Sequence, residues 1–176
     1  PGWATMTKLH ALRDDVPQCR AVLERSEVAF TALDPQGEGA CARPDRTRLD
    51  AYPLSPSSPP TTCPVGIALE LWRTDSLQPA AQEIFGSDIA QIEHLGAYSC
   101  RRLYGRDSGA WSEHATGNAI DIAGFLLEDG TRISVLGDWE GDNDKARFLR
   151  RARDGACDAF ATTLSPDYNA AHADHF

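Results

Sequence analysis

Residues 112–121 combine side-chain types that bind metal ions. The segment reads Ser-Glu-His-Ala-Thr-Gly-Asn-Ala-Ile-Asp, so an imidazole at His114 and a carboxylate at Asp121 stand on either side of Gly117. Glycine adopts positive φ angles easily, which lets the chain fold back and direct both side chains to one point. Catalytic zinc sites use three protein ligands, mostly nitrogen and oxygen, and keep one position for water. The segment therefore predicts two ligands of a zinc site in a hydrolase.

A second group of such residues lies about fifty positions further along, at His172, Asp174 and His175. The chain has only five histidines, and the remaining two, His10 and His94, have no such neighbours. Two His/Asp clusters far apart in sequence are typical of a metal site that folding assembles. We therefore expect the second cluster to complete the site.

The residue 119–125 stretch suits this role because its polar and apolar positions alternate. In a strand, alternate side chains point to opposite faces. Ala119 and Asp121 then share the face of the site, while Ile120 and Ile122 enter the core. The small side chain of Ala119 keeps space beside the metal.

Composition excludes several other functions. The chain has 176 residues, 41% of them hydrophobic, which predicts one domain, or one domain with a small N-terminal appendage. The formal net charge of −9 argues against nonspecific nucleic-acid binding. No run of 18 apolar residues is present, so we expect no membrane span.

Five scattered cysteines without a C-x-x-C pair indicate disulfides formed in an oxidising compartment. The pairing that we predict is Cys19–Cys41 and Cys100–Cys157, with Cys63 left over. Spacing alone does not determine such connectivity. Closing a loop as long as the second one contributes on the order of 4 kcal/mol in the chain-entropy model.

The order of elements predicts an α+β fold, with helices packed on a small antiparallel sheet. Residues 14–32 predict a helix, and four prolines prevent regular structure at 51–60. We expect an N-terminal helical cap over 1–50, a proline-rich connector over 51–62, and the main domain over 63–176. Within that domain, helices are predicted from 63, at 79–85 and at 144–160, a strand at 89–100, and a hairpin from 119–125 and 132–135.

The combined motif Ser-x-His-x-x-Gly-x-Ala-x-Asp with a downstream His/Asp cluster resembles the zinc D-alanyl-D-alanine peptidases, which share their fold with Hedgehog signalling domains. The bacterial extensin-like C-terminal domain family is more similar still. That resemblance runs from about Cys19 to the end of the chain and includes Cys63-Pro-Val-Gly-Ile-Ala-Leu, Tyr98-Ser-Cys-Arg101 and Pro166-Asp-Tyr-Asn-Ala-Ala-His172-Ala-Asp-His-Phe176.

The resemblance implies roles for individual residues. His114 and Asp121 look like two zinc ligands, and Ser112 resembles a serine that hydrogen-bonds substrate or ligand. Arg101 occupies a place similar to an arginine that meets the carboxylate or backbone of the substrate. Arg102 is the neighbouring candidate, and strand alternation allows only one of the two to face the cleft.

Two assignments remain for the third ligand. In this family Asp-His-Phe is typically followed by a histidine, which makes the residue after Phe176 the ligand and His175, or alternatively Asp174, the general base. By that rule the chain as given binds zinc weakly or not at all. The other assignment makes His175 the third ligand, with His172 or Asp174 as the base.

The resemblance implies a zinc metallopeptidase of the cell envelope, periplasmic or secreted, that acts on D-amino-acid-containing peptides of peptidoglycan as a D,D-carboxypeptidase or endopeptidase. Zn²⁺ is the expected cofactor. The alternative is a non-catalytic envelope-binding or structural module that retains the peptidase fold. A third interpretation is a metal-dependent amidase with another substrate.

Overall fold

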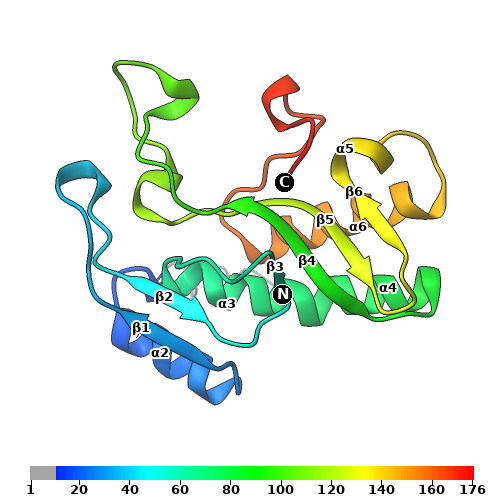
Figure 1. Cartoon of the computed structure of the whole chain (residues 1–176), viewed down its shortest axis with the longest axis horizontal. Helices are drawn as coiled ribbons and strands as arrows, with labels where there is room; N and C mark the ends of the chain where they lie inside the picture. Colours follow the sequence, from blue (N-terminus) through cyan, green and yellow to red (C-terminus); the bar gives the residue numbers. More distant parts are fainter. Residues whose placement is uncertain (1–10) are drawn as a thin grey trace.

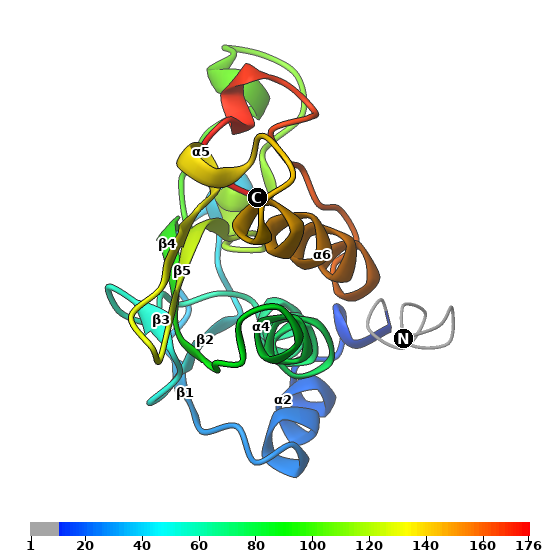
Figure 2. The same ribbon diagram turned by 90° about the vertical axis from the view of Figure 1, so that its right-hand side faces the viewer.

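A four-stranded sheet with helices on one face forms the body of the structure, a computed structural model that describes residues 11–176 (Figures 1 and 2). The strand order is β3-β4-β5-β6. The strands are β3 (Leu54–Ser55), β4 (Ile89–Gly96), β5 (Asp121–Leu127) and β6 (Arg132–Ser134). Only the short β3 runs parallel to its neighbour. The α+β class and the β5–β6 hairpin predicted from the sequence are confirmed.

The helices of the body are α3 (Cys63–Trp72), the π-helical turn η2 (Arg73–Leu77), α4 (Gln78–Phe85), the short α5 (Val135–Asp138) and α6 (Asp144–Ala159). Three of them, α3, α4 and α6, follow the predicted segments closely, whereas η2 and α5 were not predicted. Asn143 begins α6, because its side-chain oxygen accepts a hydrogen bond from the backbone N–H of Ala146. Gly86 ends α4 in the left-handed conformation at φ 66°.

Aromatic side chains hold the helical layer on the sheet. The ring of Phe125 in β5 meets Trp72 and Phe148 edge-on, at centroid distances of 5.8 and 5.2 Å. All three side chains are fully buried. The indole N–H of Trp72 donates to the carbonyl of Ala152 at 2.7 Å, so burying this side chain leaves no polar atom without a partner.

The N-terminal region differs from the long helix predicted over 14–32. The helix α2 covers only Val16–Arg25, and the chain then forms β1 (Phe30–Leu33), which pairs antiparallel with β2 (Arg46–Leu49). The prediction was wrong after residue 25, where Glu27 takes a left-handed φ of 58°. Residues 30–33 are extended because they pair with β2. The local residue pattern favours a helix there and does not show that β2 is available as a partner.

The proline-rich connector joins the body instead of standing apart from it. Its strand β3 pairs with β4, a short regular element where none was expected. Thr61 forms an isolated β-bridge with Thr47 of β2. The predicted boundaries of the cap, connector and main domain at residues 50 and 62 stay a prediction. The connector makes backbone contacts both with β2 of the predicted cap and with β4 of the predicted main domain.

The disulfide pairs differ from the predicted ones. Cys19 bonds to Cys63, and Cys41 bonds to Cys100. Cys157 is unpaired within the described residues and is exposed on α6. The predicted pairs fail because sequence spacing does not show which loops meet: α2 packs against α3, and the short helix η1 (Gly39–Cys41) lies beside the chain near Cys100. No helix in the described part of the chain has the length and apolar character needed to cross a bilayer.

Candidate functional site

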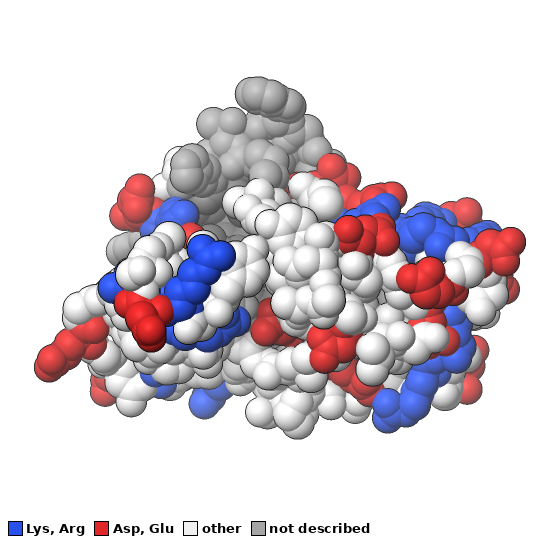
Figure 3. Space-filling model, turned by 90° about the horizontal axis from the view of Figure 1, so that it is seen from above, with Lys and Arg blue, Asp and Glu red and all other residues white. Residues whose placement is uncertain are grey.

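Two loops rise at the same end of the molecule, above the start of β5 (Figure 1). The predicted site residues His114, Asp121 and His175 lie together at the start of β5. We call residues 98–112 the aromatic flap and residues 161–176 the C-terminal flap. Seen from above in Figure 3, uncharged residues form the middle of this face, and charged side chains gather on either side of it. The site combines residues 112–121 with residues 172–175, which are far apart in the sequence.

The structure brings His114 and Asp121 into direct contact. Nε2 of His114 lies 3.0 Å from Oδ1 of Asp121. Asp121 is the first residue of β5, and its neighbour Ile122 is buried in the core, so the strand alternates as the sequence indicates. Both polar side chains are mostly buried, at 13% and 27% exposed. Their role as metal ligands stays a prediction.

Both ring nitrogens of His114 face hydrogen-bond acceptors. Nδ1 lies 3.1 Å from the carbonyl oxygen of Ala97, which can only accept, so Nδ1 carries a proton. Nε2 then presents a lone pair to the carboxylate of Asp121 unless a proton or a metal cation lies between them. The hydrogen bond with Asp121 raises the pKa of His114, against the opposing effect of burial.

His175 has the same arrangement. Its Nδ1 lies 2.7 Å from Oδ1 of Asp174, and its Nε2 lies 3.6 Å from Oδ1 of Asp121. Backbone pairing holds it there, because Phe176 and Ile122 exchange hydrogen bonds of 2.9 and 3.0 Å. A second imidazole is thus oriented by one acceptor and directed toward the same carboxylate oxygen. The hydrogen bond with His175 lowers the pKa of Asp174, which keeps Asp174 ionised at neutral pH.

His172 completes the group of imidazoles. Its Nδ1 lies 2.7 Å from Oδ1 of Asn169, and its ring centroid is 5.1 Å from that of His175. It ends the 3-10 helix η5 (Ala170–His172), which Asn169 begins as the N-cap. Burial, together with the nearby charge of His175, lowers the pKa of His172. A neutral imidazole with one nitrogen tied to an amide oxygen leaves its other nitrogen available as a base.

The two adjacent arginines lie outside the strands, so the expected strand alternation does not apply to them. Arg102 stacks on Trp111 at 4.4 Å and donates to the carbonyl of Gly109, so it holds the aromatic flap together. Burial is the largest cause of the lowered pKa of His172, and the charge of Arg101 adds to it; at His114 the hydrogen bond with Asp121 outweighs the same effect of Arg101. A contact of Arg101 with a substrate stays a prediction.

Ser112 has a structural contact in the site loop. It is buried, and its Oγ accepts a hydrogen bond from the backbone N–H of His114, which begins the 3-10 helix η4 (Glu113–Thr116). Gly117 ends that helix with φ at 71°, the positive angle expected from the sequence. A direct contact of Ser112 with substrate stays a prediction.

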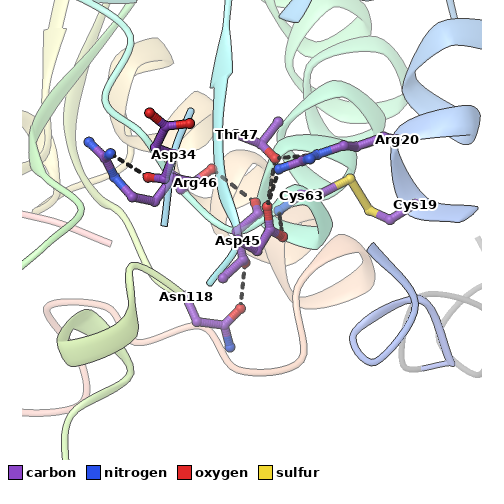
Figure 4. A network of polar contacts seen from close by, with 10 residues as sticks. Cys19, Arg20, Asp34, Asp45, Arg46, Thr47, Cys63 and Asn118 are labelled. Atoms are coloured by element: carbon purple, nitrogen blue, oxygen red, sulfur yellow. Dashed lines mark hydrogen bonds and ion pairs between the residues drawn. A yellow bond between two sulfur atoms is a disulfide. The ribbon is translucent and has the colours of Figure 1, made fainter. Parts of the chain in front are cut away.

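A buried polar network ties this loop to the N-terminal region (Figure 4). Oγ1 of Thr62 donates to Asn118 at 2.7 Å, directly after η4. Asp45 accepts a hydrogen bond from the backbone N–H of Cys63 at 2.6 Å and forms an ion pair with Arg20 at 3.1 Å. These contacts connect the start of α3 with α2 and with residues 112–118, the loop that contains His114.

The donor set fits zinc in its chemistry, although the described residues contain no ready-made cluster of three or more His, Cys, Asp or Glu side chains that could hold a metal ion. The two nitrogen–oxygen distances to Asp121, 3.0 Å from His114 and 3.6 Å from His175, fall on either side of the roughly 3.4 Å edge of a tetrahedron with bonds of about 2.1 Å. The orienting acceptors on the far ring nitrogens are what zinc-binding histidines usually have.

Sequence reasoning missed the residues that orient the imidazoles. Ala97 contributes a backbone carbonyl, which no side-chain motif reveals. Asn169 could have been found from its spacing, because an asparagine three positions before His172 suits the start of a short helix. The contact between Tyr104 and Tyr168 across the two flaps left no local signal in the sequence.

The fold and the site define a class: an α+β domain with a His/Asp site at the start of a central strand. The family model described as Extensin-like protein C-terminus matches residues 17–176, and the chain belongs to this family. The family part of the resemblance seen in the sequence is thus confirmed. No curated protein and no solved structure gives a significant match.

Proposed function

We propose that the chain is a zinc-dependent peptidase that acts on D-amino-acid-containing peptides of peptidoglycan, as a D,D-carboxypeptidase or an endopeptidase. The observation that carries the proposal is the environment of His114 and His175. Each has an acceptor on Nδ1, and each directs Nε2 toward Oδ1 of Asp121. Such an arrangement calls for positive charge at the centre of the group, which a divalent cation supplies.

In this proposal His114, Asp121 and a histidine of the C-terminal flap hold the zinc. When bound, zinc supplies a water with a pKa of about 7 and polarises the scissile carbonyl. Asp174 or His175 takes the proton of the water and passes it to the leaving amine. The ionised carboxylate of Asp174 can accept this proton, although its lowered pKa makes it a weaker base than an ordinary aspartate.

Arg101 and Ser112 orient the peptide in the same scheme. A guanidinium binds a planar carboxylate through two parallel hydrogen bonds, which suits the free end of a carboxypeptidase substrate. The electrostatic effect of Arg101 on His114 and His172 supports this role. Ser112 keeps its hydroxyl proton available, because its oxygen only accepts from His114.

The identity of the third ligand follows one of two alternatives. His175 is the nearer donor, 3.6 Å from Asp121. The antiparallel pairing of Phe176 with Ile122 sets a register in which a residue after Phe176 stands opposite Asp121 on the same face. In the second alternative that residue is the ligand, and His175 beside it is the base.

The other candidate is a cell-envelope binding or structural module without catalysis. It is favoured by the finding that residues 11–176 hold no group of three side chains already arranged for a metal. An extracellular or periplasmic location agrees with both candidates, since two disulfides form in such compartments.

Zinc titration and product analysis separate the candidates. We would titrate zinc into the chain, into a version extended by one histidine after Phe176, and into His114→Ala of each. The peptidase predicts stoichiometric binding in at least one form, its loss in His114→Ala, and shortened muropeptides detected by mass spectrometry. An amidase with another substrate predicts zinc binding without any change in the muropeptides. If neither form binds zinc, the peptidase is wrong and the non-catalytic module is favoured.

A further inference from the structure

Exposed aromatic side chains concentrate on the two flaps. Of the large hydrophobic side chains that are exposed in the described residues, most belong to these flaps: Tyr98, Leu103, Tyr104, Trp111 and Tyr168. Tyr98 and Trp111 are 42% and 41% exposed, and Tyr104 and Tyr168 are 55% and 56% exposed. A group of such side chains beside a polar site is the usual mark of a surface that binds something.

Arginines lie over three of these rings. The guanidinium of Arg43 lies 3.7 Å from the ring centroid of Tyr98, that of Arg102 lies 4.4 Å from Trp111, and that of Arg106 lies 5.4 Å from Tyr104. Each stack covers one face of a ring and leaves the rest of the ring open, as the exposed fractions require. Rings that are already oriented lose little freedom when a ligand binds, which favours binding.

The rings of Tyr104 and Tyr168 connect the flaps to the site. The hydroxyls of Tyr104 and Tyr168 lie 3.4 Å apart, and the ring of Tyr168 is 5.7 Å from that of His172. Tyr104 adopts a left-handed backbone with φ at 57°, which is uncommon for a tyrosine. Tyr104, the residue with the unusual backbone, is therefore also the residue that joins the aromatic flap to the C-terminal flap.

We propose that Tyr98, Tyr104, Trp111 and Tyr168 form a sugar-binding rim, which takes the glycan strand of peptidoglycan while the attached peptide enters the site. A pyranose ring has one face made mostly of C–H groups, and these pack on the electron-rich face of an aromatic ring. Its hydroxyls lie at the edge of the sugar, where the phenol groups and guanidinium N–H groups of the rim can reach them. This inference rests on the proposed function, because it names the part of the same substrate that lies outside the site.

The charges on the flaps favour such a strand over a nucleic acid. The aromatic flap carries Arg101, Arg102 and Arg106 against one aspartate, whereas the C-terminal flap adds Asp167 and Asp174. A surface of mixed sign does not attract a polyphosphate, and the whole chain has a net charge of −9. The arginines suit the isolated carboxylates of peptides attached to a glycan strand.

Binding to purified glycan strands from which the peptides have been removed tests the inference, with EDTA present so that no metal takes part. Trp111→Ala and the double variant Tyr104→Ala/Tyr168→Ala are compared with Leu136→Ala, which removes an exposed leucine on α5. We expect the wild-type chain and Leu136→Ala to bind equally. Trp111→Ala should weaken binding about tenfold, the effect of losing one good ring contact, and the double variant, which loses two rings, should weaken it more.

Circular dichroism and thermal melting show whether the rim variants fold, and Trp111→Phe, which keeps a ring, should restore most of the binding. Equal binding by the folded rim variants and the wild type would overturn the inference, as would failure of the wild type to bind stripped strands. Preferential binding of single-stranded DNA would overturn it in favour of a nucleic-acid surface. A failure of the proposed function alone gives another result: the protein binds glycan strands, but the zinc-loaded protein shortens no muropeptide.

Discussion

Phe176 and Ile122 exchange both backbone hydrogen bonds, so the end of the C-terminal flap is fixed to β5. The ring of Phe176 packs edge-on against Trp139 at 5.5 Å. Because Asp121 and His175 neighbour the two paired residues in sequence, this pairing determines the approach of His175 to Asp121.

Phe176→Ala should destabilise the protein and weaken its metal site together. Removing a buried phenylalanine ring costs about 2–4 kcal/mol at a site of this kind, where Phe176 is 9% exposed. Urea unfolding measures the loss of stability, and zinc titration measures the loss of affinity. Leu136→Ala, at a position 68% exposed, should change the free energy of unfolding by less than about 0.5 kcal/mol. An unchanged zinc affinity in Phe176→Ala would show that His175 is not a ligand.

The His114–Asp121 pair predicts a pH dependence of stability in metal-free protein. The pKa of His114 is raised in the folded state by its hydrogen bond with Asp121, so the folded state favours the protonated imidazole. The contribution of the pair is fully present below the unfolded pKa of about 6.5 and is lost as pH rises through the higher folded pKa. Asp121→Asn should remove this loss. Melting temperatures measured in EDTA across that range test the prediction.

Zinc affinity should follow the opposite trend with pH. Zinc competes with the proton for Nε2 of His114, so affinity falls as pH decreases through the raised pKa. Titrations at several pH values measure the midpoint of this decrease. A midpoint below that of a free histidine would contradict the prediction.

Asp45→Asn should be among the more damaging single substitutions in the N-terminal region. The buried Asp45 side chain accepts from Cys63 and Thr47 and pairs with Arg20. Losing the charge leaves Arg20 partly buried without its partner, at a cost of about 1–3 kcal/mol. Arg151→Gln breaks an exposed ion pair with Glu83 and should cost less than about 1 kcal/mol. Chemical denaturation of both variants gives the comparison.

Removing the Cys41–Cys100 disulfide should loosen the aromatic flap. The bond joins residues 59 positions apart, for which the chain-entropy model gives about 4 kcal/mol of stabilisation. The variant Cys41→Ser/Cys100→Ser should unfold at a lower temperature and show faster amide exchange in residues 98–112.

In the intact protein, Cys157 alone should react with a thiol reagent before reduction, because it is exposed and unpaired within the described residues. Peptide mapping would detect other disulfide pairs.

The parts of the fold predicted from the sequence are those determined locally. The helix that begins with the Asn143 cap and the hairpin around Gly130 follow from neighbouring residues, and both were predicted correctly. The end of α2 and the disulfide partners of Cys19 and Cys41 were predicted wrongly, because they depend on which distant segments meet. A residue pattern contains the local preference of a segment but not its tertiary partner.

The candidate site divides in the same way. The contact of His114 with Asp121 follows from a short loop with Gly117 at its turn, so spacing alone indicated it. The position of His175 depends on the pairing of Phe176 with β5, which no local pattern encodes. Strand alternation does not distinguish Arg101 from Arg102, because neither lies in a strand, and the ring on which Arg102 stacks was known only from the fold.

The disulfide connectivity also has a consequence for how the protein is made. The bonds Cys19–Cys63 and Cys41–Cys100 enclose overlapping loops, since Cys41 lies inside the first loop and Cys63 inside the second. During synthesis or export from the N-terminus, Cys19 and Cys41 emerge first and can form a bond that the finished protein does not contain. Thiol–disulfide exchange then has to replace that bond. We therefore expect efficient biogenesis to require a disulfide isomerase as well as an oxidant.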